Sequence, residues 1–512
     1  MTLGHSVRLL VVLVLLAIVP SVARPAAAAR PNIVFILADD LDLATMSELP
    51  GLQKTMASRG TSFTNHFVSV SLCCPSRATI LRGQYAHNSG VFGNKPPSGG
   101  YEVFHDNGSE ASTLAVWLKD AGYRTGLMGK YLNGYPGRQG EDFIPPGWTE
   151  WYVPARGNAY RQYDYALNEN GRIVPYGDDD GDYLTTVLDA KATEFIRRGA
   201  DDDKPFFLFV STYAPHAPAT PPPKYEDALP GARVPRTASF NEDVSDKPRW
   251  LSGFEKLGDR QIDRVDALYR KRVLTMYAVQ ELVDHVVDTL EKTGQLGNTY
   301  IVFMSDNGFH LGQHRLAPGN NTAFDTDIHV PFYLRGPDIA AGRKIDALTA
   351  NVDFAPTFAA MAGVPVPDLV DGRSLLPLLA GEQGAWRQAV LLEHGGPDGI
   401  DLQGHEDGTG LFEPPDFGGG DAPSGRKGGH NGTNTVPAFT GVRTARHTYV
   451  RYTDGERELY DNAKDPSQLE NIASVADPAL LESLERWTHR LGTCRGATCR
   501  SLEEAAPAGP DR

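Results

Sequence analysis

Residues 71–90 read SLCCPSRATILRGQYAHNSG, and this stretch carries more information about the fold than any other part of the chain. In it, Cys73 and Cys74 precede a Pro-Ser pair and Arg77, and Gly83 closes the apolar run that follows. A cysteine pair before a proline is by itself compatible with a buried thiol at a turn. Two acidic segments elsewhere in the chain favour a reactive site instead.

These acidic segments follow apolar runs of the kind found in buried strands. Asp39 and Asp40 follow PNIVFILA, and Asp306 and Asn307 follow TYIVFMS. Either pair is also compatible with an ordinary turn, since Asn-Gly favours positive φ angles. In open α/β sheets, however, ligands bind outside the carboxyl ends of the strands, so we expect the two clusters to meet at that edge. Their oxygen atoms suit a hard divalent cation, either calcium or magnesium.

Taken together, these segments resemble the formylglycine-type sulfatases, whose signature is Cys-x-Pro-Ser-Arg with a glycine a few residues on. In that family the first cysteine of the motif is oxidised to formylglycine. By spacing this is Cys73, while Cys74 occupies the free position. The resemblance covers roughly residues 30–490 and implies an alkaline-phosphatase-like fold with calcium as the preferred cation. The metal ligands that it implies are Asp39, Asp40, Cys73, Asp306 and Asn307.

The chemistry of sulfate esters explains why such residues occur together. A sulfate ester is a poor, negatively charged electrophile, so it needs a strong nucleophile and neutralisation of its oxygens. In the family, hydrated formylglycine attacks sulfur through one hydroxyl, and the other hydroxyl expels sulfate as the aldehyde re-forms. This covalent route divides one difficult step into two easier ones. The cation lowers the pKa of the attacking hydroxyl and holds the sulfate oxygens.

Further residues supply positive charge and protons by the same resemblance. Lys130 and His216 follow apolar strands, where the family places a sulfate-binding lysine and a histidine near the leaving oxygen. Arg77 would bond the nucleophile and the metal-ligand carboxylates through its fixed fork of donors. His216 is expected to protonate the departing alcohol. His87 and Asn88 share a segment with the nucleophile and are expected to contact substrate.

The chain departs from the family pattern at two positions. Leu132 stands where many arylsulfatases have a histidine, and the run Lys-Tyr-Leu-Asn instead resembles the N-acetylglucosamine-6-sulfatase branch. Asn320 stands where relatives have a second lysine. We expect Asn320 and the preceding His314 to contact substrate. Asn320 can donate a hydrogen bond to substrate, but it carries no charge and no transferable proton. The base that deprotonates the nucleophile stays unassigned.

The order of apolar patterns predicts an α/β fold with a large, mainly parallel mixed sheet between two layers of helices. Strands are expected at 32–38, 124–128, 206–211, 299–304 and 330–334, and helices near 110–121, 183–198 and 262–293. The helix after Cys73 is expected to begin near Ser76 and to direct its amide dipoles at the nucleophile.

The 512 residues are expected to divide into a leader, two folded parts and a tail. The apolar run at 9–20 with small residues after it predicts an exported protein, secreted or periplasmic, with an uncleaved anchor as the alternative. No stable membrane insertion is expected. Cys494 and Cys499 are expected to form a disulfide in an exported protein. The predicted segments are a signal peptide at 1–29, a catalytic domain at 30–380, an antiparallel C-terminal subdomain at 381–500 with a Gly/Pro-rich insertion at 395–436, and a tail at 501–512.

The net charge of −15 argues against nucleic acid as a partner, because nucleic-acid binding needs basic surfaces. An anionic substrate must then be attracted by a local positive pocket. The expected partners are a sulfated small molecule or glycan and a formylglycine-generating maturation enzyme.

These observations predict a sulfuric ester hydrolase that releases sulfate from a sulfated sugar, similar to the N-acetylglucosamine-6-sulfatases. One alternative is a phosphodiesterase or phosphonate monoester hydrolase, since related folds use the same nucleophile and metal on phosphorus. The other is a non-catalytic protein that binds sulfated glycans through a degenerate site, which Leu132 and Asn320 motivate.

Overall fold

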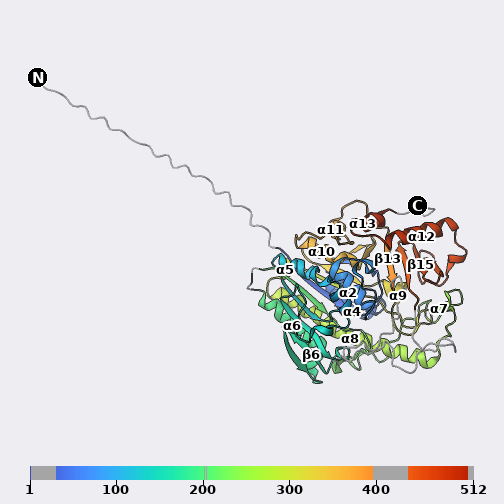
Figure 1. Ribbon diagram of the computed structural model, residues 1–512. Helices are drawn as coiled ribbons and strands as arrows, with labels where there is room; N and C mark the ends of the chain where they lie inside the picture. The colour runs from blue at the N-terminus through green and yellow to red at the C-terminus, as the bar shows by residue number, and fades with distance from the viewer. Residues whose placement is uncertain (2–29, 201, 203, 396–435, 506–512) are drawn as a thin grey trace.

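The computed structural model describes Met1 and residues 30–200, 202, 204–395 and 436–505 (Figure 1). The predicted signal peptide, apart from Met1, and nearly all of the predicted insertion lie outside the described residues, and these two predictions stay untested. In the part of the chain that is described, no helix is both long enough and apolar enough to cross a membrane.

A ten-stranded mixed sheet forms the centre of the molecule, in the order β11-β2-β10-β9-β1-β8-β4-β5-β6-β7. The strands β9, β1, β8, β4 and β5 run parallel, and β10, β6 and β7 join the sheet antiparallel to their neighbours. The bounds are β1 Asn32–Ala38, β2 Thr61–Phe63, β4 Arg124–Gly129, β5 Glu150–Gly157, β6 Tyr165–Glu169, β7 Arg172–Tyr176, β8 Phe206–Ser211, β9 Thr299–Ser305, β10 Phe332–Arg335 and β11 Arg343–Ile345. All five strands expected from the sequence are present, and the mixed sheet is confirmed.

The apolar composition of the central strands follows from burial on both faces. Every residue of β1 is buried, and its side chains alternate between two hydrophobic cores, as the two-residue period of a strand requires. Phe35 belongs to the core on one face and Ile36 to the core on the other. The register pairs Ala38 of β1 with Ser305 of β9, so the residues that follow these two strands emerge at one level of the sheet edge.

Helices cover both faces of this sheet (Figure 1). One core contains residues of α2 (Cys73–Arg82), α5 (Leu114–Asp120) and α10 (Phe354–Met361). The opposite core contains residues of α6 (Leu184–Arg198) and of the long helix α8 (Asp259–Lys292). The predicted sandwich of helices around the sheet is therefore confirmed, with α5 beginning a few residues later than expected.

Helix α2 begins at Cys73 and not near Ser76, so this sequence-based expectation was wrong. Here Pro75 lies inside the first turn, where its missing N–H has no intrahelical partner to lose. Gly83 ends the helix in a left-handed conformation with φ of 65°. The nucleophile candidate Cys73 is consequently the first residue of the helix itself.

A smaller antiparallel sheet follows, as predicted, with the order β13-β14-β15-β16. Helices α12 and α13 accompany it, and a disulfide joins Cys494 to Cys499 between them. Helix α13 continues past the tail boundary predicted at residue 501, and Glu503 is fully buried, so the folded region extends further than expected. The bounds are β13 Ala389–His394, β14 Phe439–Thr444, β15 His447–Tyr452, β16 Arg457–Asp461, α12 Pro478–Leu491 and α13 Ala497–Glu504.

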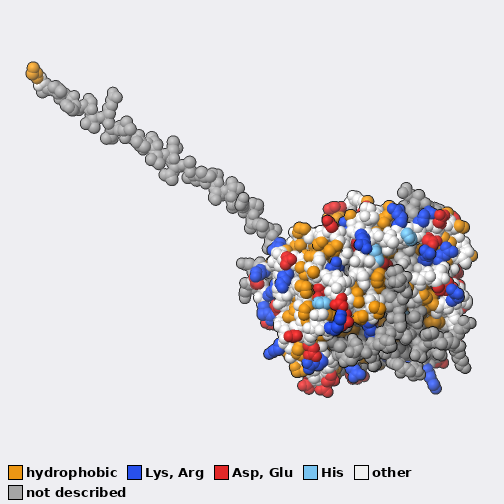
Figure 2. Space-filling model, in the orientation of Figure 1, with side chains coloured by type: hydrophobic (Ala, Val, Ile, Leu, Met, Phe, Trp, Pro, Cys, Tyr) orange, Lys and Arg blue, Asp and Glu red, His pale blue; other side chains and the backbone are white. Residues whose placement is uncertain are grey.

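Short elements complete the described chain, and a two-stranded parallel ladder pairs β3 with β12. On the face in Figure 2, acidic and basic side chains are interspersed with small apolar patches. The short elements are β3 His66–Phe67, β12 Thr349–Ala350, α1 Pro50–Leu52, α3 Ala86–Ser89, α4 Gly100–Asp106, α7 Arg249–Ser252, α9 Asp325–Ile328 and α11 Leu376–Ala380.

Candidate active site

Cys73 lies among the carboxylates that follow β1 and β9. Its Sγ is 3.4 Å from Asp39 Oδ1 and 3.7 Å from Asp40 Oδ1. Asp39, Cys73 and Asp306 bring potential ligand atoms within 4.8 Å of one another, and so do Asp40, Cys73 and His216. All of these side chains are buried. The fold thus brings together residues from three distant segments, at the sheet edge where the sequence predicted them.

Two cations neutralise part of this acidic cluster. Arg77 lies one turn after Cys73 on α2, and its Nε donates to Asp306 Oδ2 at 2.8 Å while Nη2 donates to Asp39 Oδ1 at 3.3 Å. Lys130 follows β4, and its Nζ donates to the two oxygens of Asp39 at 2.8 and 2.7 Å. Burial opposes the charged form of Lys130, but Asp39 outweighs it and raises the pKa of this lysine well above its ordinary value. Arg77 and Lys130 therefore stay charged inside the protein.

For Asp40 and Asp306, in contrast, the effect of burial on the pKa exceeds that of the neighbouring positive charges. Burial raises the pKa of Asp40, and the nearby His216 only partly offsets this effect. Burial also raises the pKa of Asp306 to about 6, although Arg77 acts against the shift. The two cations consequently do not fully compensate the acidic cluster, which indicates room for additional positive charge.

Asp40 has an unusual backbone that aims its side chain. Its φ of 66° lies in the left-handed region, and its amide donates to Asp306 Oδ1 at 3.0 Å. The Oδ1 atom of Asp40 accepts hydrogen bonds from the side-chain Nδ2 atoms of Asn307 and Asn320, at 2.6 and 3.1 Å. Asn320 therefore lies beside a predicted metal ligand, and its contact with substrate stays a prediction.

Two buried oxygens in this cluster, Asp40 Oδ2 and Asn307 Oδ1, have no hydrogen-bond partner among the described residues. Both side chains are fully buried. A polar atom buried without a partner costs free energy, and here two such oxygens lie within one acidic cluster. Carboxylate and amide oxygens are ligands that calcium accepts. The donor set therefore fits a hard divalent cation.

His216 approaches the same cluster from the segment after β8. Its Nδ1 donates to the carbonyl of Ala217 at 2.8 Å, which leaves Nε2 as the atom that faces Asp40 Oδ2, at 3.6 Å. The ring packs against Tyr160, with 4.6 Å between the ring centroids. The position of Nε2 is therefore fixed from both sides.

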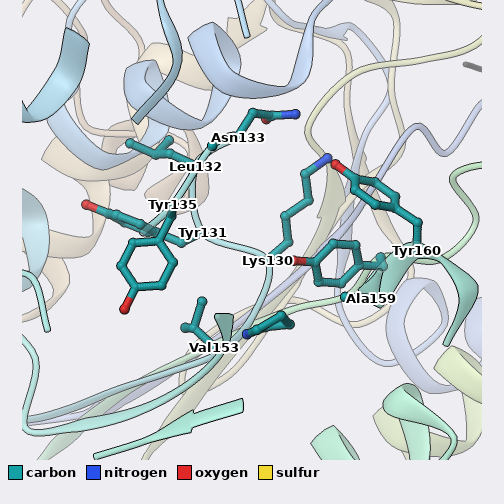
Figure 3. A pocket seen from close by; sticks show the side chains of 11 residues that line it. Lys130, Tyr131, Leu132, Asn133, Tyr135, Val153, Ala159 and Tyr160 are labelled. Atoms are coloured by element: carbon teal, nitrogen blue, oxygen red, sulfur yellow. The ribbon is translucent and has the colours of Figure 1, made fainter. Parts of the chain in front are cut away.

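A small pocket opens beside Lys130 (Figure 3). Lys130 Nζ lies 5.1 Å from the ring centroid of Tyr160, a distance at which a cation and an aromatic face attract each other. Leu132, at the position where many arylsulfatases have a histidine, is part of the wall. The lining residues are Lys130, Tyr131, Leu132, Asn133, Gly134, Tyr135, Val153, Pro154, Ala159, Tyr160 and Tyr213.

Three of the predicted substrate contacts have other partners in the structure. His87 Nδ1 lies 2.8 Å from Glu393 Oε1 and its Nε2 lies 2.9 Å from the carbonyl of Cys494. Asn88 donates to that carbonyl as well, at 2.9 Å. His314 bonds Glu242 through Nδ1, and burial lowers its pKa well below the ordinary value. Contacts of these residues with substrate stay predictions.

Sequence reasoning missed several residues that hold the site together. Ser211, the last residue of β8, accepts a hydrogen bond from Arg77 Nη1 at 2.6 Å. Arg272 of α8 donates to the backbone carbonyl of Asp40. Its position on the buried face of a helix was the available signal, because it lies seven residues after Val265 and four before Met276, which are also buried.

Comparisons with known proteins agree with this geometry. The sulfatase family model matches residues 31–364. The human N-acetylglucosamine-6-sulfatase is 34% identical over 501 residues, which cover 92% of this chain and 86% of that relative. A Caenorhabditis elegans extracellular sulfatase Sulf-1 homologue is 37% identical over 379 residues, which cover 71% of this chain but only 52% of that relative.

Solved structures share the fold at lower identity. A protein solved with its substrate D-glucosamine-2-N,6-O-disulfate has a TM-score of 0.70 at 23% identity, covering 90% of this chain and 97% of the other. A phosphonate monoester hydrolase from Silicibacter pomeroyi has a TM-score of 0.64 at 24% identity, covering 90% and 94%. These neighbours and the large mixed sheet place the protein in the class of α/β proteins with an alkaline-phosphatase-like fold. Within that class, the chain belongs to the sulfatase family.

Proposed function

We propose that the protein hydrolyses a sulfate ester of a sugar and releases inorganic sulfate, with Cys73 converted to formylglycine as the nucleophile. The observation that carries this proposal is the position of Cys73 Sγ, which lies 3.4 Å from Asp39 Oδ1 beside orphaned oxygens of Asp40 and Asn307.

The cation is proposed to be calcium, held by Asp39, Asp40, Asp306, Asn307 and the modified Cys73. When bound, it would lower the pKa of the attacking hydroxyl and neutralise the sulfate oxygens. Magnesium is the alternative that the oxygen ligands also admit.

The chain's own residues then divide the remaining work. Helix α2 begins at Cys73, so the positive end of its dipole lies at the nucleophile. Arg77 keeps Asp39 and Asp306 in place through its two donor atoms. Lys130 supplies a permanent positive charge for a sulfate oxygen. His216, with Nε2 facing the cluster, gives its proton to the departing sugar oxygen.

The sugar substrate, by analogy glucosamine 6-O-sulfate, is suggested by the N-acetylglucosamine-6-sulfatase relatives. Export is suggested by the apolar run at residues 9–20 and by the extracellular Sulf-1 relatives. A maturation enzyme that oxidises Cys73 is the expected partner, because conversion of a thiol to an aldehyde needs an external oxidant.

The test is the mass of the Cys73 peptide from native-host protein, measured together with hydrolysis of an aryl sulfate with and without calcium. Conversion of cysteine to formylglycine lowers the peptide mass by about 18 Da. We expect this loss at Cys73, not at Cys74, and turnover that a chelator abolishes. An unmodified thiol in otherwise mature protein that binds sulfated glycans tightly would favour the glycan-binding alternative.

A phosphonate monoester or phosphodiester hydrolase is the second candidate, favoured by one observation. A phosphonate monoester hydrolase shares the fold at a TM-score of 0.64, and related folds use the same nucleophile on phosphorus. Paired assays on an aryl sulfate and an aryl phosphonate, with one enzyme preparation, separate the two candidates. A higher kcat/KM on the phosphonate would replace the sulfatase proposal.

A further inference from the structure

Arg272 is a buried arginine on α8 that contacts three of the segments that form the active site. Its side chain is fully buried, although arginine is normally exposed. Nη2 donates to the backbone carbonyl of Asp40 and, at 3.1 Å, to Asp42 Oδ2 in the loop after β1. Nη1 donates to the carbonyl of Pro215 at 3.2 Å in the segment after β8.

The third contact is with the loop after β9. The guanidinium carbon of Arg272 lies 4.0 Å from the ring centroid of Phe309, which follows Asn307 by two residues. An arginine over an aromatic face is attracted by the ring, more strongly where water is excluded. One planar group therefore contacts the segments that carry Asp40, His216 and Asn307.

The hydrogen bond to Asp40 constrains a strained residue. A non-glycine residue in the left-handed region is strained, and the φ of Asp40 is 66°. Such a conformation persists only where the surroundings over-determine it. Arg272 holds the carbonyl of Asp40, and Asp306 Oδ1 holds its amide at 3.0 Å, so both ends of the residue are fixed.

The hydrogen bond from Arg272 to the Pro215 carbonyl constrains the next residue, His216. Pro215 directly precedes His216, so fixing its carbonyl limits the positions that the His216 ring can take. Only arginine combines a permanent charge with several donors in one plane, and lysine cannot satisfy two carbonyls and a carboxylate with the same geometry.

We propose that Arg272 is a positioning residue, which fixes Asp40 and His216 relative to Asn307 and thereby sets the affinity of the site for its cation. This inference rests on the calcium site proposed above. Residues that orient metal ligands typically change affinity or activity by 10–100-fold when they are removed.

The experiment measures calcium binding by titration calorimetry, in protein that keeps the unmodified Cys73, for the wild type, Arg272→Lys and Arg272→Met. We expect both variants to bind calcium about 10–100-fold more weakly. Two controls are Lys271→Met, an exposed neighbour on the same helix, and Arg387→Met, which removes a buried arginine elsewhere. Calcium affinity should be unchanged in both controls.

Activity of the mature enzyme provides a second measurement. If Arg272 acts by positioning, saturating calcium restores a large part of the kcat of Arg272→Lys, whereas a general folding defect is not restored. Wild-type calcium affinity in Arg272→Lys would overturn the inference. If neither arginine variant folds, Phe309→Leu removes the ring contact with Arg272 but keeps an apolar side chain in the core, and it is expected to weaken calcium binding several-fold. Unchanged affinity in this variant would also overturn the inference. Absence of calcium binding in the wild type would instead refute the proposed site.

Discussion

Two buried clusters of charged and polar side chains differ in how many of their acceptor oxygens receive a hydrogen bond. The tail cluster ties helix α13 to the body of the protein, and the site cluster surrounds Cys73. In the tail cluster, all four oxygens of Asp353 and Glu503 accept hydrogen bonds, among them those from Arg387 Nη2 and Nε at 2.8 Å. In the site cluster, Asp40 Oδ2 and Asn307 Oδ1 accept none among the described residues. The tail cluster consists of Tyr85, Asp353, Arg373, Arg387 and Glu503, and the site cluster of Asp39, Asp40, Arg77, Lys130, Asp306 and Asn307.

The pKa values of Asp353 and Asp40 differ in the same sense, although burial also raises the pKa of Glu503 in the tail cluster. Burial acts against ionisation of Asp353, but Arg387 outweighs it and lowers the pKa of this carboxyl. For Asp40, burial prevails and the pKa is raised. In the tail cluster the carboxylates are paired within the protein and hold parts of the chain together. In the site cluster two oxygens remain able to bind a cation. Although Arg373 Nε in the tail cluster also has no hydrogen-bond partner among the described residues, the two clusters differ in whether their acceptor oxygens are all satisfied.

The sharpest way to separate the two clusters is Asp40→Asn. We expect turnover of an aryl sulfate to fall by at least about 100-fold, since a bound cation contributes several kcal/mol to the transition state. Without calcium, the unfolding temperature should stay the same or rise, because the variant removes one buried negative charge from a crowded cluster. Calorimetry in a chelator measures this, and a drop of several degrees would contradict the division.

Arg387→Met tests the tail cluster. Breaking a buried ion pair leaves Asp353 and Glu503 without their shared partner, so the free energy of unfolding should fall by about 3–5 kcal/mol. Urea unfolding measures this loss, and calcium affinity should not change. A variant with weakened calcium binding at wild-type stability would show that the clusters are coupled.

Removal of calcium should affect only the site cluster. At free calcium 100 times the dissociation constant, binding to the folded state stabilises it by about 2.7 kcal/mol. Adding a chelator to the wild type should remove this contribution, while Asp40→Asn should show little response. Equal responses in both proteins would place the cation elsewhere.

Asn320→Lys adds the charge that the family pattern places here. At saturating calcium we expect kcat/KM on an aryl sulfate to rise roughly tenfold, which corresponds to about 1.4 kcal/mol of transition-state stabilisation. Asn320→Gln is the matched control, because it keeps the amide and should give no rise. A decrease with lysine would indicate that the asparagine is needed for its contact with Asp40 Oδ1.

Replacement of His87 gives the smallest expected effect. It tests the His87–Glu393 pair, in which both ring nitrogens of the histidine have a partner. Burial favours neutral His87, but Glu393 outweighs it and raises the pKa to about 9. The folded state therefore holds a proton that the unfolded chain releases near pH 6.5. Stability from this pair is complete below about pH 6.5 and declines as the pH rises towards 9. Unfolding of the wild type and His87→Gln at pH 6 and 10 should show that the variant loses part of this slope.

Much of the fold could be predicted because the central strands are continuous apolar runs. Their ends located Asp39, Asp40, Asp306 and Asn307 without knowledge of the sheet order. The start of α2 could not be located from the sequence, because Pro75 is as compatible with the first turn as with the first residue of a helix.

Other features depend on contacts that the sequence does not specify. His87 bonds the carbonyl of Cys494, and only the packing of the C-terminal segment against α3 reveals this contact. Arg272 is buried while Lys271 beside it is exposed, and composition alone does not distinguish the two. Helical periodicity does distinguish them, since Arg272 lies on the same face as Tyr269 and Met276.

The burial of α2 from Cys73 to Leu81 has a consequence for the timing of biosynthesis. No enzyme could reach the Cys73 thiol once this helix has packed, because the side chain is fully buried. If formylglycine is the nucleophile, oxidation has to precede folding, and each molecule is committed to an active or inert state at that moment. Preparations in which synthesis outruns oxidation would then be mixtures of identically folded molecules, and no later treatment of the folded protein would convert the inert fraction.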